Sequence, residues 1–266
     1  MSNSWISIYD NSQEARLMYV SESITDLTGW EPEQVIGVGG YDFFHPTDHA
    51  ALRKVHVSNV INEKMSSMVS YRFKCRNGSY VPIETIVHYC HDVLITCNFM
   101  YDPQSTDHKM RANTADHVYT CLSDGSLQLS GAWNDRADLL EDAMATNVWH
   151  FHNGNYSREK RFSLILNRYS DALNIVYASR LSQELVSLDI PNSIGMSFFD
   201  FVPERDVETL HAQIDLAKEH DMIVRIRFDW ITDFERGLSE PLEAITSCTD
   251  DGLVMVLRPS SKVTLE

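Results

Sequence analysis

Apolar and polar residues alternate along several short segments of the chain, and this two-residue period predicts β-strands. The segments "WISIYD" and "RLMYVS" flank "NSQEA" as the strands of a hairpin. A second hairpin is predicted from "MVSYRFKC" and "YVPIETIVHYC", and "DVLITCNFMYD" predicts a last strand. Between the hairpins, apolar residues recur at helical spacing, and "TDHAALRKVHVSNVINEK" predicts the longest helix. This order predicts an α+β domain with a five-stranded antiparallel sheet and helices on one face.

The whole pattern occurs twice in the chain. Residues 19–52 align without a gap on residues 177–210, and "PIETI" (82–86) aligns on "PLEAI" (241–245). A repeat that keeps its order and spacing over this length indicates two copies of one domain. We expect the first copy to occupy residues 1–102 and the second copy to occupy residues 160–262.

The stretch between the copies, residues 103–159, is expected to be a linker. It begins with polar loop material, "DPQSTDHKMRANTADH". The segment "AWNDRADLLEDAMATNVWHF" has helical periodicity and predicts a helix near residues 132–150. Such a helix would join the two domains or pair with a second chain.

Three segments carry a family resemblance: "TGWEPEQVIG", "DFFHPTDH" and "RNGSYVPIE". In combination they resemble the PAS family, over about residues 4–101 and, with more divergence, 160–259. The tandem arrangement is similar to that of PAS regulatory proteins of the fungal white-collar-like group. The resemblance implies a sensory or protein-interaction module that forms homodimers or pairs with another PAS protein, and that acts in transcriptional control.

Composition limits the classes of partner and the cellular compartments that we expect for the protein. The formal net charge of -16 disfavours binding of nucleic acid or of anionic membranes through the general surface. No apolar run approaches the roughly 20 residues that span a bilayer, and the N-terminal segment has no secretory signal pattern. The five cysteines contain no CxxC pair. We therefore expect an intracellular protein, cytoplasmic or nuclear, with reduced thiols.

A ligand pocket is predicted where the sheet meets the long helix. On the third strand Val69, Tyr71 and Phe73 alternate with Arg72 and Lys74, so one face is apolar and the other is polar. Together with the helix, this face would enclose a pocket for a small apolar ligand. The candidate lining residues are Leu52, Val55, His56, Tyr71 and Phe73.

His56 is also a candidate haem ligand. The resemblance implies that an axial histidine of haem-binding PAS domains comes from this helix, and imidazole is a common iron ligand. The aligned residue in the second copy is Ile214, so haem would be confined to the first domain. The alternative is a buried histidine bonded to a neighbour. Residues 21–56 and 179–214 contain no cysteine, so the cysteinyl–flavin photochemistry of light-sensing PAS domains is not expected.

Three places in the sequence hold candidate metal ligands. His45, Asp48 and His49 would supply three donors from one turn, but the second copy has Val202 and Arg205 near the histidine positions. The aromatic, proline and acidic residues recur instead, which favours a structural corner. His88 and Cys90 share a strand face, and "WHFH" (149–152) holds two histidines, but a zinc site needs about four ligands. No metal site is therefore expected.

Catalytic motifs are absent from the sequence, including GxSxG, HExxH, the P-loop and the Rossmann glycine pattern. Glu84 and Glu243 recur in the repeat, but one lies in each copy, so they are expected to be structural acids. The sequence predicts a non-enzymatic signalling module that mediates protein–protein interaction and senses a small ligand. A haem-based gas or redox sensor and a dimerisation scaffold without ligand remain as alternatives.

Overall fold

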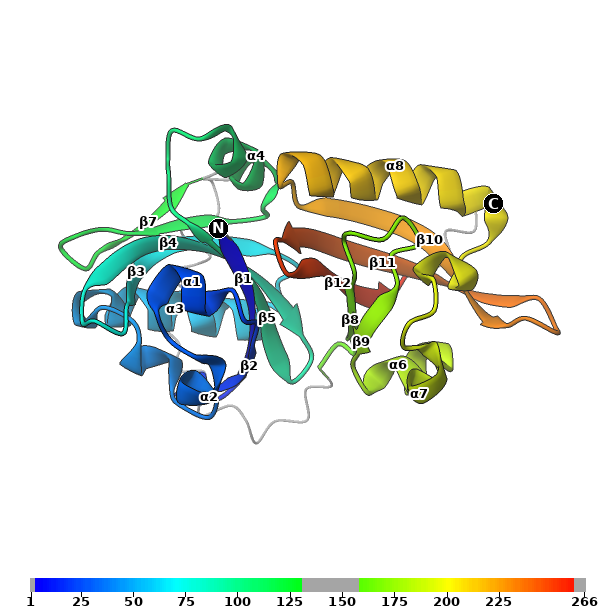
Figure 1. Cartoon of the computed structure of the whole chain (residues 1–266), viewed down its shortest axis with the longest axis horizontal. Coiled ribbons are helices and arrows are strands. Elements are labelled where there is room, and N and C mark those ends of the chain that lie inside the picture. The colour runs from blue at the N-terminus through cyan, green and yellow to red at the C-terminus, as the bar shows by residue number, and fades with distance from the viewer. Residues whose placement is uncertain (1–2, 131–157, 261–266) are drawn as a thin grey trace. The chain divides into compact units, whose positions relative to one another are not determined.

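A computed structural model of the chain describes residues 3–130 and 158–260 (Figure 1). The chain divides into two compact units. The described part of the first unit covers residues 3–130, 158 and 249–251, and that of the second unit covers residues 159–248 and 252–260. Each unit contains one β-sheet with short and long helices packed against it.

The first unit contains a seven-stranded sheet in the order β2-β1-β5-β4-β3-β6-β7. Its elements are β1 (Ser4–Asp10), β2 (Leu17–Val20), α1 (Ile24–Thr28), α2 (Pro32–Val35), η1 (Gly40–Asp42), η2 (Pro46–Asp48), α3 (His49–Ile61), β3 (Ser67–Lys74), β4 (Tyr80–Cys90), β5 (Val93–Met100), α4 (Thr106–Thr114), β6 (Val118–Cys121) and β7 (Leu127–Ser130).

The second unit contains a five-stranded sheet in the order β10-β11-β12-β8-β9. Its elements are β8 (Phe162–Leu166), β9 (Ile175–Ala178), α6 (Leu181–Val186), α7 (Ile190–Ser193), η5 (Phe198–Phe201), α8 (Glu204–His220), β10 (Val224–Asp233), β11 (Leu238–Thr249) and β12 (Gly252–Pro259). This strand order equals that of the first five strands of the first unit. The predicted α+β class is confirmed, with the same fold in both units.

Alternation along the strands places the core on one face of each sheet. In β4 the side chains of Ile83 and Val87 join the core of the first unit, while Glu84 points to the opposite face. Aromatic rings fill one end of that core: Phe73 stacks on Phe43 with ring centroids 5.8 Å apart and meets Trp5 edge-on at 5.8 Å. Burial of such rings supplies a large share of the stabilisation of a small domain.

The sheet of the first unit extends beyond the five strands that the sequence predicts. Residues 103–130 were expected to be linker, but α4 and two further strands lie there, and β6 pairs in parallel with β3. Both strands have only four residues, too few for a period to be recognised in a polar stretch. The boundary predicted at residue 102 is therefore corrected to include these elements. The helix expected near residues 132–150 lies outside the described residues.

Helix α4 is attached to the sheet by a buried ion pair. The Glu84 carboxylate on β4 is fully buried and accepts a hydrogen bond from Arg111 Nε at 2.7 Å, and His108 contacts its second oxygen. The Arg111 guanidinium also lies 4.1 Å from the ring centroid of Phe99. In the second unit the matching carboxylate, Glu243, is bonded instead by Arg258 Nη2 at 2.6 Å. The two recurring acids are thus structural, each neutralised within its own unit.

In the part of the chain that the structure describes, no helix is both long and apolar enough to cross a bilayer. None of the five cysteines is joined to another in a disulfide.

Replacement of Glu84 by glutamine would remove the buried carboxylate that accepts the hydrogen bond from Arg111 Nε. Breaking a buried pair in this way costs about 3–5 kcal/mol. We expect the Glu84→Gln variant to lower the free energy of unfolding of the first unit by about that amount, and to speed amide hydrogen exchange in α4. Glu184→Gln is the control, because the pair of Glu184 with Lys160 is exposed and worth less than about 1 kcal/mol. Equal effects of the two substitutions in urea titrations would contradict the assignment.

Candidate functional site

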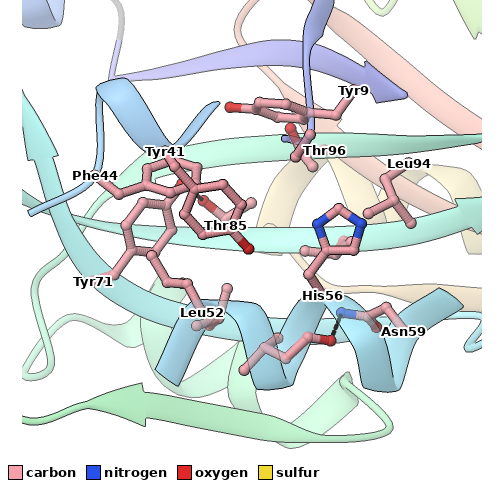
Figure 2. Close-up of a pocket in the computed structure, with 14 residues that line it drawn as sticks. Tyr9, Tyr41, Phe44, Leu52, His56, Asn59, Tyr71, Thr85, Leu94 and Thr96 are labelled. Carbon is pink, nitrogen blue, oxygen red and sulfur yellow. Dashed lines mark hydrogen bonds between the residues drawn. The ribbon is translucent and has the colours of Figure 1, made fainter. Parts of the chain in front are cut away.

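A cavity of about 60 Å³ lies inside the first unit, between helix α3 and the sheet (Figure 2). Every side chain that lines it is uncharged at neutral pH or has a pKa shifted so that it is neutral there. The lining residues are Tyr9, Ala15, Tyr41, Phe44, Leu52, Val55, His56, Asn59, Val69, Tyr71, Thr85, Val87, Leu94 and Thr96.

One wall of the cavity is a single face of α3. Leu52, Val55, His56 and Asn59 recur at intervals of three and four residues, so they lie on the same side of the helix. Figure 2 shows His56 and Leu52 projecting from α3 toward the strands. The Asn59 side chain is fixed, because its Nδ2 donates to the Val55 carbonyl at 3.0 Å and its Oδ1 accepts from Ser67 Oγ at 2.6 Å.

The opposite wall is a hydrogen-bonded network on the inner face of the sheet. The Thr85 hydroxyl lies 3.1 Å from the Tyr71 hydroxyl and 2.8 Å from Asn98 Oδ1. Asn98 Nδ2 in turn donates to Ser7 Oγ at 3.1 Å and lies 3.2 Å from Thr96 Oγ1. Buried polar groups are costly unless they are bonded, and this network satisfies several of them at once.

Burial keeps the titratable groups of the cavity neutral. It lowers the pKa of His56 to about 4, so the imidazole is uncharged at neutral pH. Burial also raises the pKa values of Tyr9, Tyr41 and Tyr71 well above the ordinary value for a phenol. The site therefore offers hydrogen-bond donors and acceptors without a formal charge.

The polar character of this core is specific to the first unit. Strand pairing and the repeat align seven of its polar positions with seven apolar residues of the second unit. Ser7, Tyr9, His56, Asn59, Tyr71, Thr85 and Thr96 align with Leu164, Leu166, Ile214, Ala217, Phe228, Ala244 and Met255. All seven of these apolar residues belong to the core of the second unit. At these seven positions the second core is apolar, while the first core keeps polar side chains.

Comparison with known proteins identifies the family of the first unit. Residues 17–93 match the family model described as PAS fold. The first unit is a PAS domain. The match covers β2, α3, β3 and β4, whereas β1 and almost all of β5, which also line the cavity, lie outside it.

Curated relatives are similar over this same domain. The chain is 30% identical over 76 residues to Protein cycle of Drosophila melanogaster, and 33% identical over 75 residues to hypoxia-inducible factor 1-alpha of Bos taurus. It is 24% identical over 74 residues to basic helix-loop-helix ARNT-like protein 2 of Mus musculus. Each match covers 28% of this chain, but only 18%, 9% and 13% of the respective relatives.

Solved structures show the same kind of partial likeness. The Drosophila melanogaster Cycle PAS-B domain with bound glycerol has 24% identity and a TM-score of 0.34, covering 36% of this chain and 99% of that one. The PAS domain of the Cronobacter turicensis quorum-sensing receptor RpfR in complex with BDSF has 21% identity and a TM-score of 0.34, covering 38% and 97%.

Four of the five predicted pocket residues lie around the cavity of the PAS domain, namely Leu52, Val55, His56 and Tyr71. Phe73 does not line it, because it lies two residues farther along β3 and packs into the aromatic cluster. Sequence reasoning missed the contributions of β1, η1, β4 and β5. The inward residues of β4 and β5 alternate with outward ones, so that period was the signal that could have found Thr85 and Thr96.

The candidate metal ligands His45, Asp48 and His49 make hydrogen bonds within the first unit instead. Asp48 is fully buried and accepts hydrogen bonds from the Arg72 backbone N–H at 3.0 Å and Nε at 3.1 Å. His45 Nδ1 accepts from the Thr47 backbone N–H at 3.2 Å and caps η2. His49 Nε2 lies 3.0 Å from the Phe44 carbonyl. No group of three metal-ligating side chains occurs among the described residues.

The remaining two candidate sites were on a strand and in the linker. His88 is fully buried on β4, with Nδ1 2.8 Å from the Met65 carbonyl, and Cys90 follows on the same strand. Residues 149–152 lie outside the described part of the chain.

The lowered pKa of His56 couples stability to pH. Its folded-state pKa of about 4 lies below the ordinary 6.5, so the unfolded chain binds a proton at this residue first as pH falls. The contribution of neutral His56 to the free energy of unfolding is fully present above pH 6.5. It is lost as pH falls toward 4, at about 1 kcal/mol per pH unit. We expect His56→Gln to remove this contribution, so the difference in unfolding free energy between variant and wild type should change between pH 7 and pH 5. Parallel urea-derived profiles over that range would contradict the prediction.

Proposed function

We propose that the protein is a non-enzymatic signalling module in which the first PAS domain senses a small neutral ligand and the two domains mediate protein–protein interaction. The single observation that carries the sensory part is the polar lining of the first core at positions where the second core is entirely apolar. Burying polar groups is costly, so a core that only held the fold together would be expected to carry apolar residues there, as the second unit does.

Volume and charge define the ligand class. A cavity of about 60 Å³ is about twice the share of one water in the liquid, roughly 30 Å³. It would hold a molecule of only a few non-hydrogen atoms. Since no lining group is charged, an ion would lose its hydration without a counter-charge. A neutral molecule with a hydroxyl or carbonyl would bond to the Thr85–Tyr71 network or to His56, and its apolar part would contact Val55 and Val87.

The haem alternative does not fit these residues. His56 does project into the cavity, but even drug-sized ligands occupy pockets of roughly 300–1,000 Å³. A porphyrin would displace Tyr71, Leu94 and their neighbours from a closely packed core. We therefore propose no role for haem, and assign His56 to ligand contact.

The process that the module regulates, and its partner protein, are proposed from its similarity to other PAS proteins. Similarity to a hypoxia-inducible factor and to a basic helix-loop-helix protein supports a role in transcriptional regulation with another PAS protein, or a second copy, as partner. Membership of the fungal white-collar-like group remains a prediction that rests on the tandem arrangement alone. The whole function of the relatives is not transferred, because the matched stretch is less than a fifth of each.

Filling the cavity tests the sensory proposal. Val69→Ile and Val87→Ile together add two methyl groups into the space without adding charge, at a cost of about 1–3 kcal/mol for each. We expect a small neutral molecule to be released on denaturation of the purified wild-type protein, and at least tenfold less of it from the filled variant. Mass spectrometry of the released fraction is the measurement.

The matched control is Ile226→Val, which shortens a core side chain at the position in β10 that aligns with Val69. It should leave the amount of released molecule unchanged. Equal release from the filled variant, or a cavity that admits charged and neutral probes alike in NMR titrations, would contradict the proposal.

A further inference from the structure

Apolar side chains are exposed at matching positions of both units. Met18 on β2 is 57% exposed, and its counterpart Val176 on β9 is 56% exposed. Ile36 after α2 is 44% exposed, and its counterpart Ile194 after α7 is 47% exposed. Single exposed apolar residues are common and need no explanation. Tyr19 on β2 and its counterpart Tyr177 on β9 are 42% and 41% exposed. Agreement at three positions in two copies with diverged cores indicates that this surface has been retained.

Backbone hydrogen bonds hold β2, which carries Met18, beside the turn after α2, which carries Ile36. The Leu17 N–H donates to the Val38 carbonyl at 3.0 Å, and the Gly37 N–H donates to the Leu17 carbonyl at 2.7 Å. Gly37 has φ +84°, a conformation that side-chain-bearing residues rarely adopt, and this turn places Ile36 beside the edge strand. The second unit repeats the arrangement with Gly195 and Ile175.

The surroundings of the surface differ between the units. In the first unit, Tyr19 and Ile36 border a hollow lined by Asp26 and Asp251 as well as by the exposed carboxylates of Glu22, Glu31 and Glu33. In the second unit, Arg180 and Pro191 align with Glu22 and Glu33, while Glu184 and Asp189 keep the acids of Asp26 and Glu31. The first unit therefore combines an apolar patch with an acidic border, whereas the second keeps the patch with fewer of these acids.

We propose that the surface formed by Met18, Tyr19 and Ile36 docks a segment of a partner protein that presents apolar side chains flanked by lysine or arginine. Apolar contact supplies affinity, and the three carboxylates supply charge complementarity and orientation. A second copy of the chain is disfavoured as the occupant, because pairing this surface with itself would bring Glu22, Glu31 and Glu33 against the same acids. The inference rests on the protein–protein interaction part of the proposed function and names a surface for it, but it needs neither a ligand in the cavity nor a PAS partner.

The test uses the full chain and a short fluorescent amphipathic peptide of leucine and lysine, with a leucine–glutamate peptide of the same pattern as control. We expect anisotropy titrations to show saturable binding of the lysine peptide only. Met18→Ser with Ile36→Ser should weaken it at least about tenfold. Both side chains are exposed, so the fold should be unaffected. The matched variant Val176→Ser with Ile194→Ser should change binding less than about twofold.

Charge is tested separately. Glu22→Gln with Glu33→Gln should weaken binding of the lysine peptide and flatten its dependence on salt. The proposal is overturned if the glutamate peptide binds equally well, or if both serine variants lose binding to the same extent. It is also overturned if size-exclusion chromatography shows a homodimer that Met18→Ser with Ile36→Ser dissociates, because the occupant would then be a second copy.

Discussion

The two-residue period of β4 is the constraint on which the rest of the first unit depends. Glu84 and Thr85 are neighbours in sequence, yet the pleat sends them to opposite faces of the sheet. On one face a buried carboxylate requires a cation, which α4 provides through Arg111. On the other face a buried hydroxyl requires hydrogen-bonding partners, which Tyr71 and Asn98 provide. A register slip of one residue would exchange these surroundings and leave both groups unsatisfied.

The second unit has the same topology with apolar residues at the inward positions that are polar in the first unit. Ala244 replaces Thr85 and Phe228 replaces Tyr71, and the core becomes a continuous apolar cluster. Trp230 stands at the position of Phe73 and stacks on Phe201 with centroids 5.0 Å apart. Glu243 keeps its place, but its counter-charge comes from Arg258 on the neighbouring β12 instead of from an added helix. One fold is thus compatible with a polar or an apolar lining at the same inward positions.

Much of the fold could be predicted because its signals are local. The strands have two-residue periods, Gly37 and Gly78 end segments with positive φ, and the repeat doubles each signal. The cavity was only partly predictable. Leu52, Val55 and His56 follow from helical spacing, but Tyr9 and Thr96 reach the site through strand pairing between segments far apart in sequence. Whether space remains between such residues depends on rotamers and packing, which no periodicity encodes.

The cavity and the exposed apolar surface of the first PAS domain differ in the molecules that they are proposed to bind. The cavity has a neutral lining, so its proposed ligand would be selected by size and by hydrogen bonding. The surface around Met18 and Ile36 is exposed and bordered by carboxylates, so its proposed partner would be selected by charge and apolar contact. β1 joins them, because Tyr9 lines the cavity from this strand while its neighbour Ile8 pairs with Tyr19 on β2. A ligand that displaced Tyr9 would therefore strain the strand that supports the edge, and an effect of the ligand on docking requires no more than this one shared strand.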